Sequence, residues 1–207
     1  MTRWPRKEFL CRAHAAVHFK AKRREDLARL RTLYGDFTER LAQTEAHHVA
    51  LAAITLDGID ADHPARPDVV RLLAAVARTS VRYFAEFDDQ AFRAFGSTRD
   101  RSRAHGHKTR AAERNAHAVP VDVAWLRRAY RDRCVYCGSR SEHIDHLWPL
   151  VDGGDDAPWN LAPSCASCNL SKGPRSLGAW LPGHLVALDV DHRRGVGDLW
   201  DQLTAAG

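Results

Sequence analysis

The stretch Cys134-Val-Tyr-Cys137, separated by 27 residues from Cys165-Ala-Ser-Cys168, decides how this part of the chain folds. A CxxC turn brings two sulfur atoms within reach of one ion, so two such turns can complete a tetrahedral zinc site. Redox pairs or unrelated turns are the alternative, but no thioredoxin-like pattern surrounds either pair. We therefore expect a structural Zn²⁺, since four sulfur ligands leave no open position; its ligands are Cys134, Cys137, Cys165 and Cys168.

Polar side chains suited to attack on a phosphodiester lie between and just after the cysteine pairs. Asp145-His146 places a hard oxygen ligand beside a base, and Asn169 directly follows the last cysteine. Phosphodiester hydrolysis needs an activated water and a cation that neutralises the phosphate, and oxygen ligands suit Mg²⁺ or Mn²⁺. The sequence therefore predicts a catalytic divalent metal held by Asp145 and Asn169, with His146 as the base.

The local pattern predicts a strand, a return loop, a second strand and a short helix. Neighbours on a regular strand point to opposite faces, so Asp145 and His146 can share a site only if the strand bends or ends there. Gly153-Gly154 permits a tight return, and Asn160-Leu161 begins the returning strand. Residues 165–172 then read as a helix, from which Lys172 and Arg175 are expected to line the phosphate path.

The order of these motifs resembles the HNH nucleases, in particular their four-cysteine, zinc-containing branch, over roughly residues 130 to 178. The resemblance implies a ββα-metal module in which His146 is the general base and Asp145 and Asn169 are the metal ligands. It also implies that Asn160 constrains the loop and orients the base. The final histidine of the family's name is an asparagine here, as in H-N-N variants. DNA as the substrate rests on this resemblance alone.

The charge is uneven along the chain. Residues 1 to 33 carry ten Lys/Arg against three acids, and residues 97 to 118 carry six against two, whereas the remaining segments are net acidic. This distribution suits a polyanionic partner, although solvated helix faces and a linker would give the same pattern. We expect the second basic segment to bind nucleic acid through Arg99, Arg101, Arg103, Lys108 and Arg110.

Apolar residues at spacings of three and four predict two long helices before the basic segment, the first towards Leu56 and the second from Val69 towards Phe95. The expected fold class is α+β, mostly α: a helical N-terminal region plus a small zinc-braced ββα-metal module. The expected division is a helical region at 1–96, a basic linker or arm at 97–118, an HNH module at 119–178 and a C-terminal helical cap at 179–207.

The sequence as a whole favours a metal-dependent endonuclease that acts on nucleic acid, with DNA favoured over RNA. A non-catalytic zinc-containing nucleic-acid-binding protein, an adaptor in a larger assembly and an RNA-cleaving toxin stay open as alternatives. The N-terminal helices could contact a protein partner. Because no apolar run reaches the ~18 residues of a membrane span and the N-terminus lacks an apolar signal core, we expect a cytoplasmic protein without a membrane partner.

Overall fold

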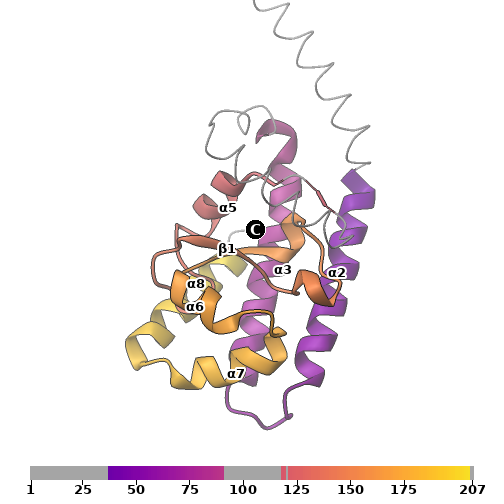
Figure 1. Ribbon diagram of the computed structural model, residues 1–207. Coiled ribbons are helices and arrows are strands. Elements are labelled where there is room, and N and C mark those ends of the chain that lie inside the picture. Colours follow the sequence, from indigo (N-terminus) through magenta and orange to yellow (C-terminus); the bar gives the residue numbers. More distant parts are fainter. Residues whose placement is uncertain (1–36, 91–117, 120, 206–207) are drawn as a thin grey trace, which may run out of the picture. The chain divides into compact units, whose positions relative to one another are not determined.

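The computed structural model describes residues 37–90, 118–119 and 121–205 (Figure 1). The described residues belong to one compact unit that begins at Phe37. Its elements run in the order α2 (Phe37–Asp57), α3 (Arg66–Gln90), α5 (Val123–Ala129), β1 (His143–His146), η1 (Leu150–Asp152), η2 (Pro158–Asn160), β2 (Leu161–Ser164), α6 (Ala166–Lys172), α7 (Leu177–Ala187) and α8 (Val190–Ala205). The predicted fold class, α+β and mostly α, is confirmed.

Helices α2 and α3 pack against each other as an antiparallel pair (Figure 1). Helix α2 ends at Asp57-Gly58, and the Arg66 guanidinium closes the turn by donating to the carbonyls of Leu56 and Ile59. The Leu56 carbonyl lies in the last turn of α2, where carbonyl groups have no intrahelical partner, and it also accepts from the Ile59 amide at 3.2 Å. The two long helices expected from the apolar spacing are therefore present, joined by the predicted loop.

One hydrophobic core connects these helices to the cysteine-containing region. Helix α3 packs on α8, where the Arg71 guanidinium lies 2.8 Å from an Asp201 carboxylate oxygen. Trp200 of α8 is buried, and its indole Nε1 donates to the Val135 carbonyl between the first two cysteines. The same core includes Leu72 of α3 and all four cysteines of the two pairs. Within the described residues, the helices outside the cysteine motifs thus share their interior with them.

Strands β1 and β2 form a short antiparallel hairpin, with His143 opposite Ser164 and His146 opposite Leu161. Cys165 follows β2 immediately and is the N-cap of α6, so the chain turns from strand to helix at a cysteine. The predicted strand, return strand and helix are all present in this order. Helix α6 packs on β1 and on α7.

Helix α7 approaches α2 closely at Gly178. A Cβ atom at this position would lie 2.5 Å from the Thr55 carbonyl oxygen, which is inside the contact distance of any side chain. Glycine therefore lets the two backbones touch. The expected boundaries at residues 96, 118 and 178 remain a prediction, and residues 1–36 and 91–117 lie outside the described part of the chain.

Candidate functional site

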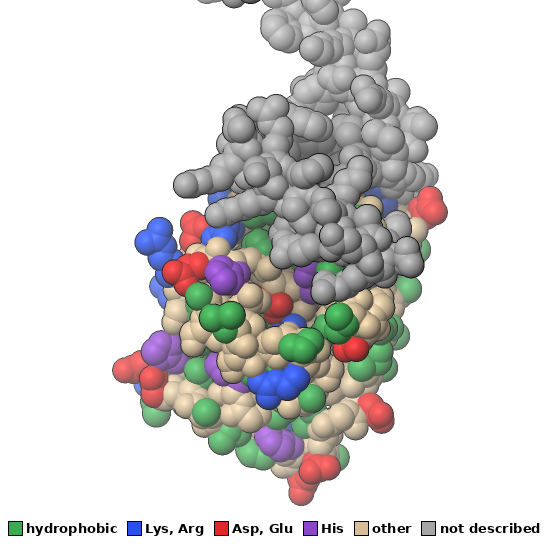
Figure 2. All heavy atoms as spheres, in the orientation of Figure 1, with side chains coloured by type: hydrophobic (Ala, Val, Ile, Leu, Met, Phe, Trp, Pro, Cys, Tyr) green, Lys and Arg blue, Asp and Glu red, His purple; other side chains and the backbone are tan. Residues whose placement is uncertain are grey.

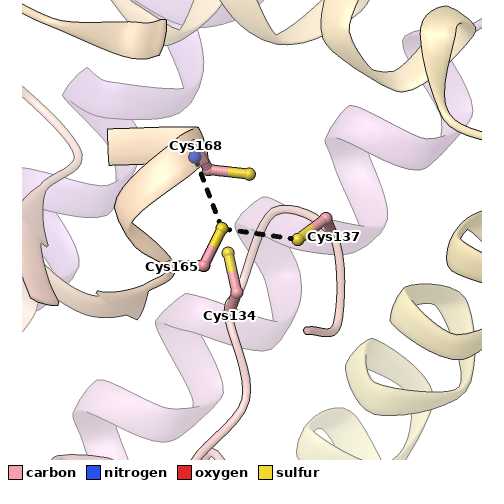
Figure 3. A group of neighbouring side chains, drawn as sticks. All are labelled: Cys134, Cys137, Cys165 and Cys168. Atoms are coloured by element: carbon pink, nitrogen blue, oxygen red, sulfur yellow. Dashed lines mark hydrogen bonds between the residues drawn. The ribbon is translucent and has the colours of Figure 1, made fainter. Parts of the chain in front are cut away.

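The four cysteines converge on one point. Their Sγ atoms all lie within 4.8 Å of one another, and the sulfurs of Cys137 and Cys165 are 3.8 Å apart (Figure 3). A tetrahedron with Zn–S bonds of ~2.3 Å has sulfur–sulfur edges of about 3.8 Å. The cluster is buried and its dimensions are compatible with a zinc ion, so the residues present fit the expected metal.

Short local turns hold each cysteine pair. In the first pair the Gly138 amide donates to the Cys134 carbonyl at 2.9 Å, and Gly138 has a φ of +74°, which favours glycine. In the second pair the Cys168 amide donates to Cys165 Sγ at 3.3 Å, so the first helical turn of α6 points its N–H towards sulfur. Backbone donors to sulfur favour thiolate over thiol. The second turn is thus suited to a deprotonated ligand, and in the first turn a backbone hydrogen bond from Ser139 helps to lower the pKa of Cys137.

Mutual hydrogen bonds separate the pKa values of the clustered thiols. The pKa of Cys137 is lowered, because Cys134 and then Cys168 hydrogen-bond to its sulfur. The pKa of Cys168 is raised by its bonds to Cys134 and Cys137, and that of Cys134 rises to about 12 beside Cys137. Four sulfurs cannot all be ionised at this spacing without a cation among them. A divalent ion would supply that charge.

Asp145 is enclosed by two donors. The Tyr136 hydroxyl donates to one carboxylate oxygen at 2.6 Å, and the Lys172 ammonium lies 3.2 Å from the same oxygen. Burial raises the pKa of Tyr136, so its hydroxyl keeps the proton that it donates. Lys172 is only 1% exposed and also donates to the His146 carbonyl at 2.8 Å. A cation therefore already neutralises this carboxylate.

Asn169 and His146 have other partners. The Asn169 side-chain amide lies 3.0 Å from His143 Nδ1, and the His146 Nε2 lies 2.9 Å from an Asp156 carboxylate oxygen. Asp145 and His143 are two residues apart on β1 and both contact α6, whereas the His146 ring reaches the loop between the strands. Successive side chains on a strand point to opposite faces, so His146 points away from the face that carries His143 and Asp145. The hairpin and α6 thus bring Asp145, Asn169 and Lys172 to one interface, and His146 points to Asp156.

Asn160 ties the loop between the strands together. Its carbonyl oxygen accepts from the Trp148 amide at 2.8 Å, and its amide nitrogen donates to the carbonyls of Trp148 at 2.9 Å and Asp155 at 2.7 Å. At Gly154 a Cβ atom would lie 2.1 Å from the Trp148 carbonyl oxygen. Asparagine and glycine are both required by the tight path of this loop.

The expected phosphate-binding residues differ in exposure. Arg175 is exposed, with Nε 3.2 Å from the Lys172 carbonyl and a second bond to the Ser171 carbonyl. Lys172 is buried against Asp145 and does not face the solvent. The arm residues Arg99, Arg101, Arg103, Lys108 and Arg110 lie outside the described residues.

Comparison with known proteins identifies the segment. Residues 134–175 match the family model of the HNH endonucleases, and this part of the chain is an HNH domain with a four-cysteine cluster. A search of curated proteins gave no match, and neither did a search of solved structures. Among the described residues, no helix combines the length and apolar character needed to cross a bilayer.

Several partners of the candidate site were not anticipated from the sequence. Tyr136 lies inside the first CxxC turn and Asp156 in the loop, and neither position carries a motif of its own. His143 could have been assigned to the face of Asp145 from strand alternation. His184, whose Nε2 lies 3.5 Å from Cys168 Sγ, comes from α7 beyond the motif, and no sequence signal pointed to it.

Proposed function

We propose that the protein is a metal-dependent endonuclease that hydrolyses phosphodiester bonds of nucleic acid, with DNA as the favoured substrate. The observation that supports this most is the coincidence of the HNH match with a hairpin–helix unit. In this unit Lys172 of α6 bonds to Asp145 and to the His146 carbonyl, and Asn169 of α6 contacts His143 of β1. Zinc in the cysteine cluster would brace this unit and take no part in the chemistry, since its four ligands saturate it.

His146 is proposed to activate the attacking water. An ionised Asp156 carboxylate only accepts hydrogen bonds, so the proton of the imidazole belongs on Nε2 and the basic nitrogen is Nδ1. Asp156 would hold this tautomer and stabilise the imidazolium that forms when the water proton moves to Nδ1. The water oxygen then bonds to phosphorus as the bond to the leaving 3′ oxygen breaks, and the 3′ oxygen takes a proton from solvent, giving a 5′-phosphate and a 3′-hydroxyl.

Asp145 and Asn169 would hold the catalytic Mg²⁺ or Mn²⁺. A carboxylate and an amide oxygen are hard ligands, so this donor set suits such an ion. When bound, such an ion neutralises phosphate charge and assists the leaving oxygen. The contact between the Asn169 amide group and His143 Nδ1 supports this role, because an NH₂ that donates to Nδ1 leaves the amide oxygen as the ligand atom.

An arginine rim beside the cysteine cluster supports binding to nucleic acid. We use this name for four exposed residues at the end of α5 and on the first cysteine turn: Arg128, Arg131, Arg133 and Arg140. Arg131 and Asp132 both adopt left-handed φ angles, near +55°, and residues 133 and 140 pair through a β-bridge. Within the described residues, no ion pair engages Arg131, Arg133 or Arg140. Figure 2 shows side chains of both charges on the face that it draws.

Nicking of supercoiled plasmid over a series of Mg²⁺ and Mn²⁺ concentrations tests the proposal. We expect His146→Ala to lower the rate by roughly 10²- to 10⁴-fold. His192→Ala, on α8, is the matched control and should cleave like the wild type. Metal-dependent nicking that survives His146→Ala would refute the assignment of the base. Parallel assays with RNA separate a DNase from an RNA-cleaving toxin.

The same protein tests the rim through the salt dependence of binding. Combined Arg131→Gln, Arg133→Gln and Arg140→Gln should flatten the slope of log K against log salt by about 0.9 for each phosphate that the variant no longer neutralises. Arg78→Gln with Arg194→Gln, two exposed arginines on α3 and α8, is the control. An unchanged slope would show that the rim does not bind phosphates.

A non-catalytic nucleic-acid-binding protein is the second candidate, and the Lys172–Asp145 pair is the observation that favours it. An ammonium at the carboxylate competes with a divalent metal for the same negative charge. Salt-sensitive plasmid binding with no nicking at any metal concentration would support this candidate. Activity that returns only with a partner protein would indicate an adaptor-dependent nuclease.

A further inference from the structure

Helix α7 places an imidazole against the cysteine cluster, outside the segment that matches the HNH family. His184 Nε2 lies 3.5 Å from Cys168 Sγ, within hydrogen-bonding distance for sulfur. Residue 184 lies nine positions beyond the end of the match at 175. The contact joins a helix of the C-terminal region to the last of the four sulfurs.

Neighbouring side chains fix the orientation of this imidazole. The His184 ring stacks on Trp180, with the centroids 4.5 Å apart and the planes 18° from parallel. Trp180 is held in turn by its Nε1 bond to Ser171 Oγ at 3.1 Å and by edge contact with Tyr136. Each of these partners belongs to α6 or to the first cysteine turn. The ring is therefore aimed at Cys168 before any metal binds.

The direction of the hydrogen bond follows from the chemistry of a zinc-bound thiolate. Such a sulfur has no proton and can only accept, so Nε2 must carry the hydrogen. Four thiolates around one Zn²⁺ leave two negative charges in a buried place, and each N–H directed at sulfur offsets part of them.

We propose that His184 is a positioning residue of the zinc site, donating from Nε2 to Cys168 Sγ and thereby slowing release of the metal. The inference rests on the zinc assigned under the proposed function. Partners that hydrogen-bond to metal ligands change metal affinity by roughly 10- to 100-fold when removed. The zinc site thus extends from the two CxxC turns into α7.

Two substitutions in the full-length protein separate the donor from the ring. His184→Phe keeps a ring that can stack on Trp180 and removes the N–H, whereas His184→Gln keeps an N–H near the position of Nε2 and removes the ring. Zinc release into an excess of a chromogenic chelator gives the rate of loss. The cobalt-substituted proteins give the energy of the sulfur-to-metal charge-transfer band, which reports directly on the thiolate.

We expect His184→Phe to lose zinc about 10- to 100-fold faster, with a cobalt band shifted to longer wavelength because the thiolate has lost a donor. His184→Gln and the control His192→Phe should remain near the wild type in both measurements. An unchanged rate of zinc release and an unchanged cobalt band in His184→Phe would overturn the inference. Equally faster zinc release in His184→Phe and His184→Gln would overturn it as well. Wild-type protein that holds no zinc would instead refute the zinc assignment, and this inference with it.

Discussion

The cysteine cluster and the polar set of the hairpin differ in how they are assembled. The four sulfurs come from two short turns, each closed by its own backbone, and they meet at a single point (Figure 3). Asp145, His146 and Asn169 instead each bind a different side chain: Lys172, Asp156 and His143. A local turn therefore forms each half of the cluster, whereas the polar site depends on contacts between side chains of several elements.

Removing one sulfur should have the largest effect. We expect Cys165→Ala to lose zinc and to unfold the described helices and strands cooperatively, because the cysteines share one core with Leu72 and Trp200. Structural zinc contributes about 10 to 16 kcal/mol in small modules, as much as the whole stability of an ordinary domain. Circular dichroism during heating, with zinc content measured in parallel, checks this. Cys11→Ala is the control for loss of a cysteine outside the cluster. A Cys165→Ala variant that unfolds at the same temperature as the wild type would contradict the expected stabilisation by zinc.

Among the polar residues of the hairpin and α6, Lys172→Met should lower the free energy of unfolding the most. It would leave the buried Asp145 carboxylate without its cation, and breaking a buried pair in this way costs about 3 to 5 kcal/mol. Urea denaturation measures the free energy of unfolding. Adding Asp145→Asn should recover much of the loss, because the uncompensated charge disappears. A single mutant as stable as the wild type would mean that water or a metal ion reaches Asp145.

Two asparagines offer a matched comparison within the HNH domain. Asn160→Ala removes three hydrogen bonds and should cost about 3 kcal/mol, whereas Asn169→Ala removes the contact with His143 and should cost about 1 kcal/mol. The proposed roles predict the opposite order for metal-dependent nicking, with the greater loss in Asn169→Ala. Similar stability losses in both variants would show that the loop does not depend on Asn160.

The smallest expected effect lies on α2 and depends on pH. Burial, followed by the nearby His47, lowers the pKa of His48 to about 3 in the folded protein, against about 6.5 in an unfolded chain. Between these values the unfolded chain binds the additional proton, so stability is complete above pH 6.5 and falls as the pH decreases. The free energy of unfolding changes by at most about 1.4 kcal/mol per pH unit through this group. Denaturant titrations give the free energy of unfolding at pH 7 and at pH 5. The difference between these two values should be smaller for His48→Leu than for the wild type. Equal differences would refute the lowered pKa.

Much of the fold was accessible from sequence spacing because it rests on local chemistry. Asp122 caps α5, accepting from the Trp125 amide at 2.9 Å, and Gly153 has the left-handed φ that a tight return needs. The helix after Cys165 begins where the cysteine spacing predicted it. Each of these features depends on residues within a few positions of one another, which is the range over which spacing carries information.

The partners of the candidate site were not accessible in this way. Tyr136 and Asp145 are nine residues apart, Lys172 and Asp145 are 27 apart, and His184 reaches Cys168 from the next helix. No periodic pattern connects such positions. Their contacts arise only when α6 packs on β1 and α7 packs on α6.

The amino-acid sequence alone determined the two CxxC turns, the strand–loop–strand–helix order and the residue types able to bind a metal and move a proton, since each depends on short-range backbone geometry and side-chain chemistry. The tertiary structure decided which charges meet. It buried Lys172 against Asp145, directed His146 to Asp156 and brought His184 to the sulfur cluster, because electrostatic partners are chosen by proximity in space, and only packing of the whole core creates that proximity.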